Sequence, residues 1–200
     1  MNITVPPFSL SNSQSEQVSF PSGKASLVCF IKEDCPTCRE VMPVLAAMAQ
    51  VVGDALDFHV IGQTETGNQT LLETFSPPFD ILDDSTLKVS FASDIDTVPT
   101  LVWSDDQGES TQTLIGFVKD EWLALTESLS AAHGVSAPSL DWQSLPDWRP
   151  GCGSLSVDPL IADRLRAEAE NSPLRARRID IGVADDEVEF WCDEGFAGGL

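Results

Sequence analysis

Cys35 and Cys38 are the residues of this sequence whose type and spacing most directly indicate chemistry. They enclose two residues in the motif Cys35-Pro36-Thr37-Cys38. Two cysteines at this spacing can exchange a disulfide, provide half of a metal site, or be two thiols that are close only by chance. The residues around the motif distinguish these possibilities.

A structural metal site is the main alternative, and it needs more ligands than the sequence offers. A structural zinc ion takes four ligands, commonly from two paired-cysteine motifs or from one such motif and two later histidines. The chain has only two histidines, His59 and His133, which are far apart, and Cys152 and Cys192 are each single. We therefore expect neither a metal nor another cofactor.

A redox pair requires that the first cysteine stand just before a helix. Free backbone N–H groups and the positive end of the helix dipole then stabilise its thiolate, which lowers the thiol pKa from about 8.5 towards neutrality. The thiolate attacks a substrate disulfide and forms a mixed disulfide, and a cysteine one helical turn further along releases the product. This reasoning makes Cys35 the nucleophile and Cys38 the resolving thiol.

The segments that flank the motif have the patterns that this chemistry needs. Residues 25–31 are apolar and β-branched and predict a buried strand. From Pro36 to Gln50 apolar residues recur at helical spacing, so a helix begins within the motif, and Pro43 is expected to kink it. The further elements that we expect are a strand at 57–63, a helix at 68–75 capped by Asn68, strands at 97–103 and 111–118, and a helix at 119–133. This order predicts a mixed sheet with helices on its faces.

The composition changes after residue 134. We predict a first domain at 1–134, a Pro/Gly/Ser-rich linker or wrapping segment at 135–157, and a C-terminal extension at 158–200. The extension is expected to begin with a helix that has Asp158 as its N-cap and Pro159 at its first position, followed by a strand. It has too few residues for an independent core, so it must dock, pair with another chain, or be the start of a truncated second domain.

Charge and cysteine content limit the partners and the compartment. The 200 residues carry 11 Lys and Arg against 32 Asp and Glu, a net charge of −21, which disfavours nucleic acid and anionic lipid as partners. No apolar run is long enough to insert in a membrane, and the first residues lack the pattern of a signal peptide. The five cysteines are not densely spaced as in a disulfide-stapled secreted domain. We therefore expect a cytoplasmic protein.

Two separate motifs make the sequence resemble the thioredoxin superfamily. Pro43 stands eight positions after Cys35, as in the active-site helix of that family, and Val98-Pro99-Thr100 resembles its cis-proline loop. The resemblance implies an α/β thioredoxin fold, followed here by a small C-terminal α+β extension, and a thiol–disulfide oxidoreductase. It also implies that the Val98–Pro99 bond is cis and that Val98, Pro99 and Thr100 bind the substrate backbone beside the cysteines.

The resemblance is closest to the TlpA/ResA type of thiol–disulfide oxidoreductase and covers about residues 8–130. Residues 8–38 are similar to the strand pair, Gly-Lys turn and central strand of that type, and residues 81–109 to its later half, with Gly116 closing the match. The partners it implies are protein dithiol or disulfide substrates and an unidentified electron donor.

The sequence departs from the thioredoxin pattern in three places, at Cys29, at Asp34 and at Pro36-Thr37. Cys29 occupies the place of a buried Asp and is expected to be an inert core thiol. Asp34 replaces the Trp before the first cysteine, and its charge is expected to raise the pKa of Cys35 slightly. Pro36-Thr37 differs from the Gly-Pro of thioredoxin, so the redox potential of that family does not transfer.

Two other functions are weighed against the oxidoreductase. Peroxiredoxins share the fold, but Ile31 and Cys35 stand where their motif has Pro and Thr. A non-catalytic thioredoxin-like interaction module, fused to a second domain, is the alternative from another functional class.

The segment after residue 134 contributes three further candidate residues. Cys152 lies between two glycines on an expected accessible loop, and it is either a spectator thiol or an extra redox cysteine that exchanges disulfides with Cys35 or Cys192. Trp142 and Trp148 are expected to anchor the segment on the first domain.

Overall fold

Five strands form one mixed sheet in the order β5-β4-β3-β7-β8. The computed structural model describes residues 3–52, 55–134, 136 and 140–170. The strands of the sheet are β3 (Ser26–Ile31), β4 (Asp57–Gly62), β5 (Ile81–Asp83), β7 (Thr100–Ser104) and β8 (Ser110–Ile115). Strands β3, β4 and β5 are mutually parallel, whereas β7 is antiparallel to both β3 and β8. The central strand β3 is buried at all six residues, as its apolar sequence predicts.

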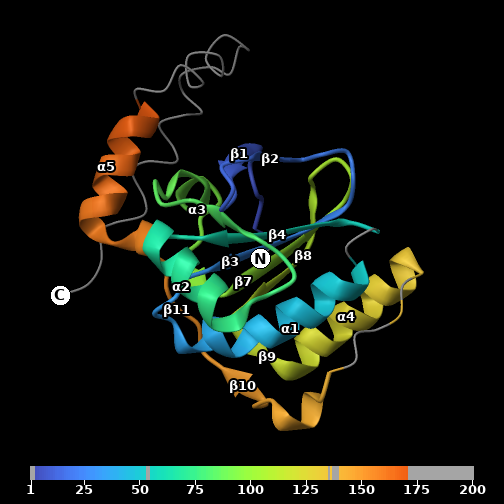
Figure 1. The fold of residues 1–200 in the computed structure, drawn as a ribbon. Coiled ribbons are helices and arrows are strands. Elements are labelled where there is room, and N and C mark those ends of the chain that lie inside the picture. The colour runs from blue at the N-terminus through green and yellow to red at the C-terminus, as the bar shows by residue number, and fades with distance from the viewer. Residues whose placement is uncertain (1–2, 53–54, 135, 137–139, 171–200) are drawn as a thin grey trace, which may run out of the picture.

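Helices cover both faces of this sheet, which confirms the predicted α/β architecture (Figure 1). The helices are α1 (Pro36–Val52), α2 (Glu65–Phe75), α3 (Lys88–Ala92), α4 (Lys119–His133) and α5 (Pro159–Glu170), with 3₁₀ turns η1 (Trp142–Ser144) and η2 (Leu155–Val157). Figure 1 shows α1 and α4 side by side below the sheet and α3 above it.

Helix α1 begins inside the cysteine motif. Proline suits its first position, where a backbone donor would have no partner within the helix, and the helix continues through Pro43. Val44, Leu45 and Met48 lie on the face that packs against the sheet and are at most 1% exposed. The helix is therefore fixed by its apolar face, and it holds the two cysteines at its N-terminal end.

Helix α2 differs from its prediction at the N-terminus. It begins at Glu65 rather than near residue 68, and Thr64 is the N-cap, because its side chain accepts a hydrogen bond from the backbone N–H of Gly67. Asn68, the predicted cap, is buried within the helix. Residues 88–92, whose sequence pattern fits either a strand or a helix, form α3.

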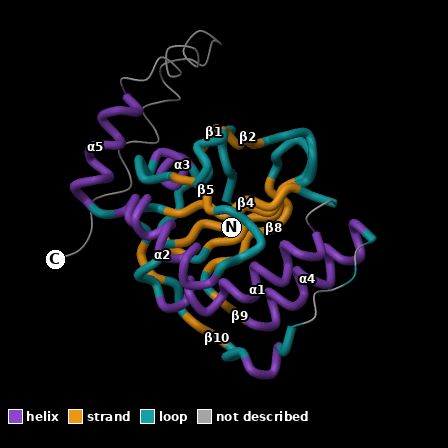
Figure 2. The backbone as a smooth tube through the Cα atoms, in the orientation of Figure 1, coloured by secondary structure: helices purple, strands orange, loops and turns teal. Residues whose placement is uncertain are grey.

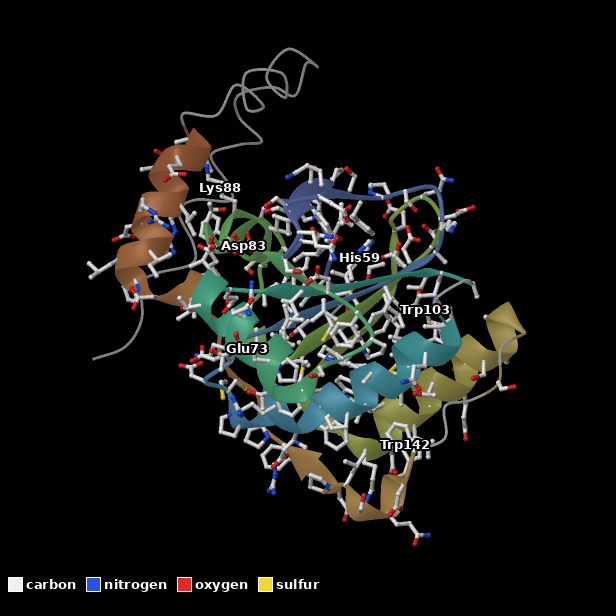
Figure 3. The ribbon with its side chains drawn as sticks, in the orientation of Figure 1. His59, Glu73, Asp83, Lys88, Trp103 and Trp142 are labelled. Atoms are coloured by element: carbon white, nitrogen blue, oxygen red, sulfur yellow. The ribbon has the colours of Figure 1, made fainter. Side chains whose placement is uncertain are left out.

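A hairpin of β1 (Phe8–Ser11) and β2 (Gln17–Phe20) packs on the sheet. The rings of Phe8 and Phe20 stack at 5.3 Å between centroids, and both lie nearly perpendicular to the ring of His59 on β4. Figure 3 shows His59 on the side of the sheet that carries this hairpin. The hairpin thus closes the face opposite α1 and α4.

Four two-residue strands connect the chain after residue 140 to the sheet domain. Strand β10 (Trp148–Arg149) pairs with β9 (Phe117–Val118), and β11 (Cys152–Gly153) pairs with β6 (Thr97–Val98). Figure 2 shows β10 beside β9, at the end of the molecule away from the β1–β2 hairpin. Residues 148–153, here called the covering segment, therefore lie against the domain rather than apart from it.

The last described element is α5, which begins as the sequence predicts. Asp158 accepts a hydrogen bond from the backbone N–H of Leu160 at 3.0 Å, and Pro159 takes the first helical position. Ala162 and Leu165 are buried. The strand predicted after this helix and Cys192 lie outside the described residues, and the division of the chain at 134 and 157 stays a prediction.

Candidate active site

Cys35 stands directly before α1, and the amide end of that helix points at its sulfur. The backbone N–H of Cys38 donates a hydrogen bond to the Cys35 Sγ at 3.3 Å. The Cys38 Sγ in turn accepts one from the backbone N–H of Lys32 at 3.5 Å. The structure therefore brings the two predicted cysteines together at a helix N-terminus, where negative charge on sulfur is stabilised.

The two thiols are electrostatically unequal. The pKa of Cys35 is lowered from 9.0 to about 5, mainly by a hydrogen bond from the Cys38 thiol. Burial opposes this shift. Cys152 and the backbone N–H groups of Cys38 and Thr37 lower the pKa further. Burial, and then the hydrogen bond to Cys35, raise the pKa of Cys38 far above its ordinary value. At neutral pH the pair therefore carries its charge on Cys35.

Asp34 does not determine the ionisation of Cys35. The pKa of Cys35 is lowered, and the carboxylate of Asp34 lies 3.2 Å from the ammonium of Lys32, in an ion pair. The hydrogen bonds to Cys35 therefore outweigh any slight rise from Asp34 and decide the ionisation of Cys35.

The Val98-Pro99-Thr100 stretch lies beside the cysteines. The Val98–Pro99 peptide bond is cis, which is the geometry that the sequence resemblance implied. The Cys35 Sγ lies 3.4 Å from the carbonyl oxygen of Val98, to which the protonated thiol donates a hydrogen bond. The Thr100 hydroxyl instead donates to the carbonyl oxygen of Thr97, and Val98 provides the hydrogen-bond acceptor for Cys35.

The covering segment reaches the site from the far end of the described chain. The register of β11 with β6 pairs Cys152 with Val98, and the Cys152 thiol helps to lower the pKa of Cys35. The hydroxyl of Thr37 donates to the carbonyl oxygen of Pro150 at 2.6 Å. With this segment in place, Cys35 is 0% exposed.

Two expectations about this segment are corrected by the structure. Cys152 is half-buried in a short strand beside Cys35, not on an accessible loop. Trp148 is 61% exposed and so is not a buried anchor, whereas Trp142 packs against the core near α4 (Figure 3). Backbone pairing, rather than the Trp148 ring, holds β10 in place.

The sequence held one signal for this arrangement, the glycine on each side of Cys152. A Cβ on Gly151 would lie 2.3 Å from the Thr97 Cγ2 and 2.7 Å from the Val98 carbonyl oxygen, whereas one on Gly153 would meet nothing within 4 Å. Gly151 therefore allows two backbones to approach closely, as glycine commonly does. The pattern did not show which backbone it approaches.

The remaining described cysteine, Cys29, is a core residue. It is 0% exposed on β3, and burial raises the pKa of its thiol far above the ordinary value. Within the part of the chain that the structure describes, no group of three or more His, Cys, Asp or Glu side chains is placed to hold a metal ion. None of the described helices is long and apolar enough to cross a membrane.

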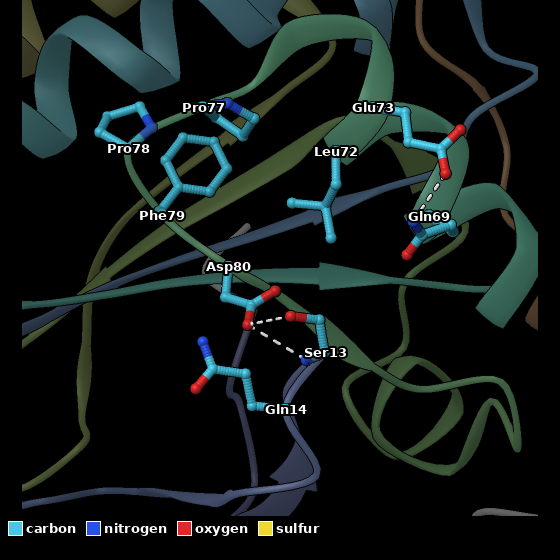
Figure 4. Close-up of a pocket in the computed structure, with 9 residues that line it drawn as sticks. All are labelled: Ser13, Gln14, Gln69, Leu72, Glu73, Pro77, Pro78, Phe79 and Asp80. Carbon is cyan, nitrogen blue, oxygen red and sulfur yellow. Dashed lines mark hydrogen bonds between the residues drawn. The ribbon is translucent and has the colours of Figure 1, made fainter.

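A separate shallow hollow lies between the end of α2 and the β1–β2 turn (Figure 4). Four of its polar residues are already paired: the Asp80 carboxylate accepts from the N–H and hydroxyl of Ser13, and Gln69 donates to Glu73. No cysteine lines it. The thiol cluster is therefore the better candidate for chemistry.

Comparison with known proteins shows the fold. No protein-family model and no curated protein matches the chain. The chain is similar to solved structures, among them the following three.

The thioredoxin domain of a thiol-disulfide oxidoreductase from Bacteroides vulgatus is 17% identical to this chain. The match covers 64% of this chain and 98% of that chain, with a TM-score of 0.55. The exposed lipoprotein thioredoxin Etrx1 of Streptococcus pneumoniae is 18% identical, with coverage of 63% and 99% and a TM-score of 0.56. A secreted disulfide oxidoreductase of Mycobacterium tuberculosis is 19% identical, with coverage of 62% and 95% and a TM-score of 0.52.

These likenesses establish that the chain has the thioredoxin fold. Each solved chain is matched over almost its whole length, whereas a large part of the present chain has no counterpart in it.

Proposed function

We propose that this protein is a thiol–disulfide oxidoreductase in which Cys35 attacks a substrate disulfide and Cys38 resolves the mixed disulfide. The observation that carries the proposal is the position of the Cys35 Sγ at the amide end of α1, 3.3 Å from the N–H of Cys38. This placement, on the fold shared with the structural neighbours, provides a stabilised thiolate next to a second thiol.

The first step uses the charge difference between the two sulfurs. The Cys35 thiolate attacks one sulfur of the substrate disulfide, forms a mixed disulfide and releases the other substrate sulfur as a thiolate. Because its pKa is about 5, Cys35 is ionised at neutral pH without a neighbouring base. Cys38 stays protonated through this step, since burial and the charge on Cys35 both raise its pKa.

The second step follows from the loss of that charge. Once Cys35 is in a mixed disulfide it is neutral, so its contribution to the raised pKa of Cys38 disappears. The N–H of Lys32, 3.5 Å from the Cys38 Sγ, then favours the Cys38 thiolate. Cys38 attacks Cys35 and forms the intramolecular disulfide, and the substrate leaves as a thiol.

The substrates that we propose are proteins with dithiols or disulfides. We expect an extended substrate backbone to bind beside Cys35, along Val98, Pro99 and Thr100. Val98 belongs to the short strand β6, and its carbonyl oxygen lies next to the Cys35 sulfur. A separate electron donor would restore the dithiol. The cytoplasmic location expected from the sequence is also a proposal, which cell fractionation tests.

The reduction of insulin by dithiothreitol, followed by turbidity, tests this function. We expect the wild type to accelerate the reaction, Cys35→Ser to leave only the uncatalysed rate, and Cys38→Ser to accumulate a mixed disulfide on Cys35. Equal rates for the wild type and Cys35→Ser would remove the enzymatic proposal and favour the interaction module.

A further inference from the structure

The covering segment occupies the place where an added strand would meet the active site. Its residues 152–153 form an antiparallel pair with Thr97 and Val98, at the edge that a substrate backbone would use under the proposed function. Its residues 148–149 form a second pair with β9. The chain thus adds its own strand at the edge beside the two cysteines.

The register of this pairing positions a thiol at the reacting sulfur. Cys152 is opposite Val98, and the carbonyl oxygen of Val98 lies 3.4 Å from the Cys35 Sγ. This register places the Cys152 thiol beside Cys35, close enough that it helps to lower the pKa of Cys35. The sulfur of Cys152 therefore takes the position of a cysteine in a bound substrate strand.

Contacts on both sides of Cys152 hold it there. Before it, Pro150 accepts a hydrogen bond from Thr37 at 2.6 Å, and the backbone of Arg149 passes so close to Gly116 that a Cβ on that glycine would lie 3.1 Å from the Arg149 carbonyl oxygen. The Arg149 guanidinium also pairs with Glu40 on α1 at 3.0 Å.

After Cys152 the chain enters a buried polar network. The N–H of Ser154 donates to the carbonyl oxygen of Asp96 at 2.8 Å, and its hydroxyl accepts from the amide of Gln63 at 2.6 Å. The Ser156 hydroxyl donates to the carbonyl oxygen of Ile95 at 2.8 Å. Because these groups are buried and bonded, the position of Cys152 is fixed by the fold.

We propose that Cys152 is a third redox-active cysteine, which exchanges disulfides with Cys35 from within the same chain. The proposal rests on the proposed function, because it uses the same nucleophile. In this proposal the covering segment acts as a tethered substrate strand. An external protein substrate must displace it to reach Cys35.

The exchange balances with a low-molecular-weight disulfide as the oxidant. The Cys35 thiolate attacks that disulfide, forms a mixed disulfide and releases one thiolate. Cys152 then attacks the Cys35 sulfur, and its proton passes to the second leaving thiolate. The products are a Cys35–Cys152 disulfide and two reduced small thiols, so two electrons pass from the protein dithiol to the oxidant.

Cys38 connects this disulfide to the main pair. Its thiolate attacks the sulfur of Cys35, breaks the Cys35–Cys152 bond and returns Cys152 as a thiol. The product is the Cys35–Cys38 disulfide, with no net change in oxidation state. This is the resolving step of the proposed function, with Cys152 in the role of the substrate sulfur.

The trapping experiment uses the full chain with the substitution Cys38→Ser. The protein is oxidised with glutathione disulfide, and its remaining free thiols are alkylated. It is then digested without reduction, and the linked peptides are mapped by mass spectrometry. We expect a peptide pair linked through Cys35 and Cys152 as the main product. Adding Cys152→Ser should remove it and leave glutathione on Cys35, while adding Cys192→Ser should leave the linked pair intact.

The outcome of this experiment distinguishes a failure of the proposed role of Cys152 from a failure of the proposed oxidoreductase function. If glutathione stays on Cys35 of Cys38→Ser while Cys152 remains alkylated, or if Cys35 is linked to Cys192, the assignment of Cys152 is wrong and the oxidoreductase still stands. If Cys35 takes up neither glutathione nor any cysteine, the proposed function fails with it.

A matched pair of glycine variants tests the position of the segment without changing a thiol. In the Cys38→Ser background, Gly151→Ala should slow formation of the Cys35–Cys152 disulfide by roughly tenfold or more, because the two sulfurs lose their enforced proximity. Its added Cβ would meet Thr97 at 2.3 Å, whereas that of Gly153→Ala meets nothing within 4 Å. Gly153→Ala should therefore react at the parent rate. Equal rates in two variants that both show the parent circular dichroism would contradict the tethered strand.

Discussion

The hydroxyl of Thr37, between the two cysteines of the motif, donates a 2.6 Å hydrogen bond to the carbonyl oxygen of Pro150. These residues are 113 positions apart in the sequence. The contact ties helix α1 to the covering segment, so the cysteine motif takes part in covering its own thiols.

Thr37→Val keeps the branched side chain but removes this hydrogen bond. We expect the free energy of unfolding to fall by about 1 kcal/mol, because a partly buried hydrogen bond is lost. Cys35, which is 0% exposed, should be alkylated several-fold faster as the covering segment loosens. Peptide mapping after timed alkylation measures this rate at Cys35 alone.

Thr74→Val is the matched control for that substitution. The Thr74 hydroxyl also bonds a carbonyl oxygen, that of Thr70 at 2.7 Å, but on an exposed face of α2. It should leave the alkylation of Cys35 unchanged. The same Cys35 rate in both variants would show that the Thr37–Pro150 bond does not hold the segment closed.

The ionisation of Cys35 should follow its hydrogen bonds. The thiolate absorbance of Cys35 is the absorbance that the wild type shows and Cys35→Ser lacks. We expect it to titrate near pH 5 in the wild type, because the Cys38 thiol lowers the pKa of Cys35 most. Cys38→Ala should raise the pKa clearly, and Cys152→Ala should raise it less. A titration close to 9.0 in the wild type would contradict the geometry described for the two sulfurs.

The same ionisation makes the stability of the reduced protein depend on pH. The pKa of Cys35 in the folded state, about 5, lies below its ordinary value of 9.0, so folding favours the thiolate. This contribution is complete above about pH 9 and is lost as the pH falls through about 5. Urea unfolding of reduced wild type and Cys35→Ser at several pH values isolates it as the difference between them.

The reduction potential of the Cys35–Cys38 pair should be more oxidising than that of thioredoxin. A stabilised thiolate favours the dithiol over the disulfide, and the pKa of about 5 lies between the values of about 7 in thioredoxin and about 3.5 in DsbA. We expect a potential above about −270 mV and below about −120 mV. Equilibration of the Cys152→Ser variant with glutathione buffers measures it without interference from the third thiol, and a value at or below that of thioredoxin would contradict the expectation.

The parts of the fold that local patterns determine could be predicted from the sequence. Strand β3 and helix α1 have strong apolar signals, and the spacing of Cys35 and Cys38 placed the motif at the junction between them. The start of α2 was missed because Thr64 and Asn68 are both good capping residues, and only the fold shows that Asn68 is buried.

The covering segment could not be predicted because its strands are two residues long. A pair such as Cys152–Gly153 has no periodicity, and its partner at Thr97–Val98 is more than 50 positions away. The proximity of Cys152 to Cys35 therefore depends on tertiary contacts such as those of Gln63, whose side chain gave no signal in the sequence.

Gln63→Met tests the buried network that fixes the chain after Cys152. Gln63 is 1% exposed; its amide nitrogen donates to Ser154 at 2.6 Å and to Ser90 at 3.2 Å, and its oxygen accepts from the N–H of Leu155 at 3.0 Å. Methionine has a similar shape but makes none of these bonds. We expect the free energy of unfolding to fall by about 2–3 kcal/mol, because buried polar groups lose their partners.

The control variant is Gln69→Met, on the exposed face of α2, which should change the free energy of unfolding by less than about 0.5 kcal/mol. Urea unfolding compares the two, and timed alkylation should show a faster reaction at Cys152 only in Gln63→Met. Equal stabilities and equal Cys152 rates would mean that Gln63 does not anchor the segment, and that the pairing with Val98 and the contacts of Arg149 and Pro150 position Cys152 without it.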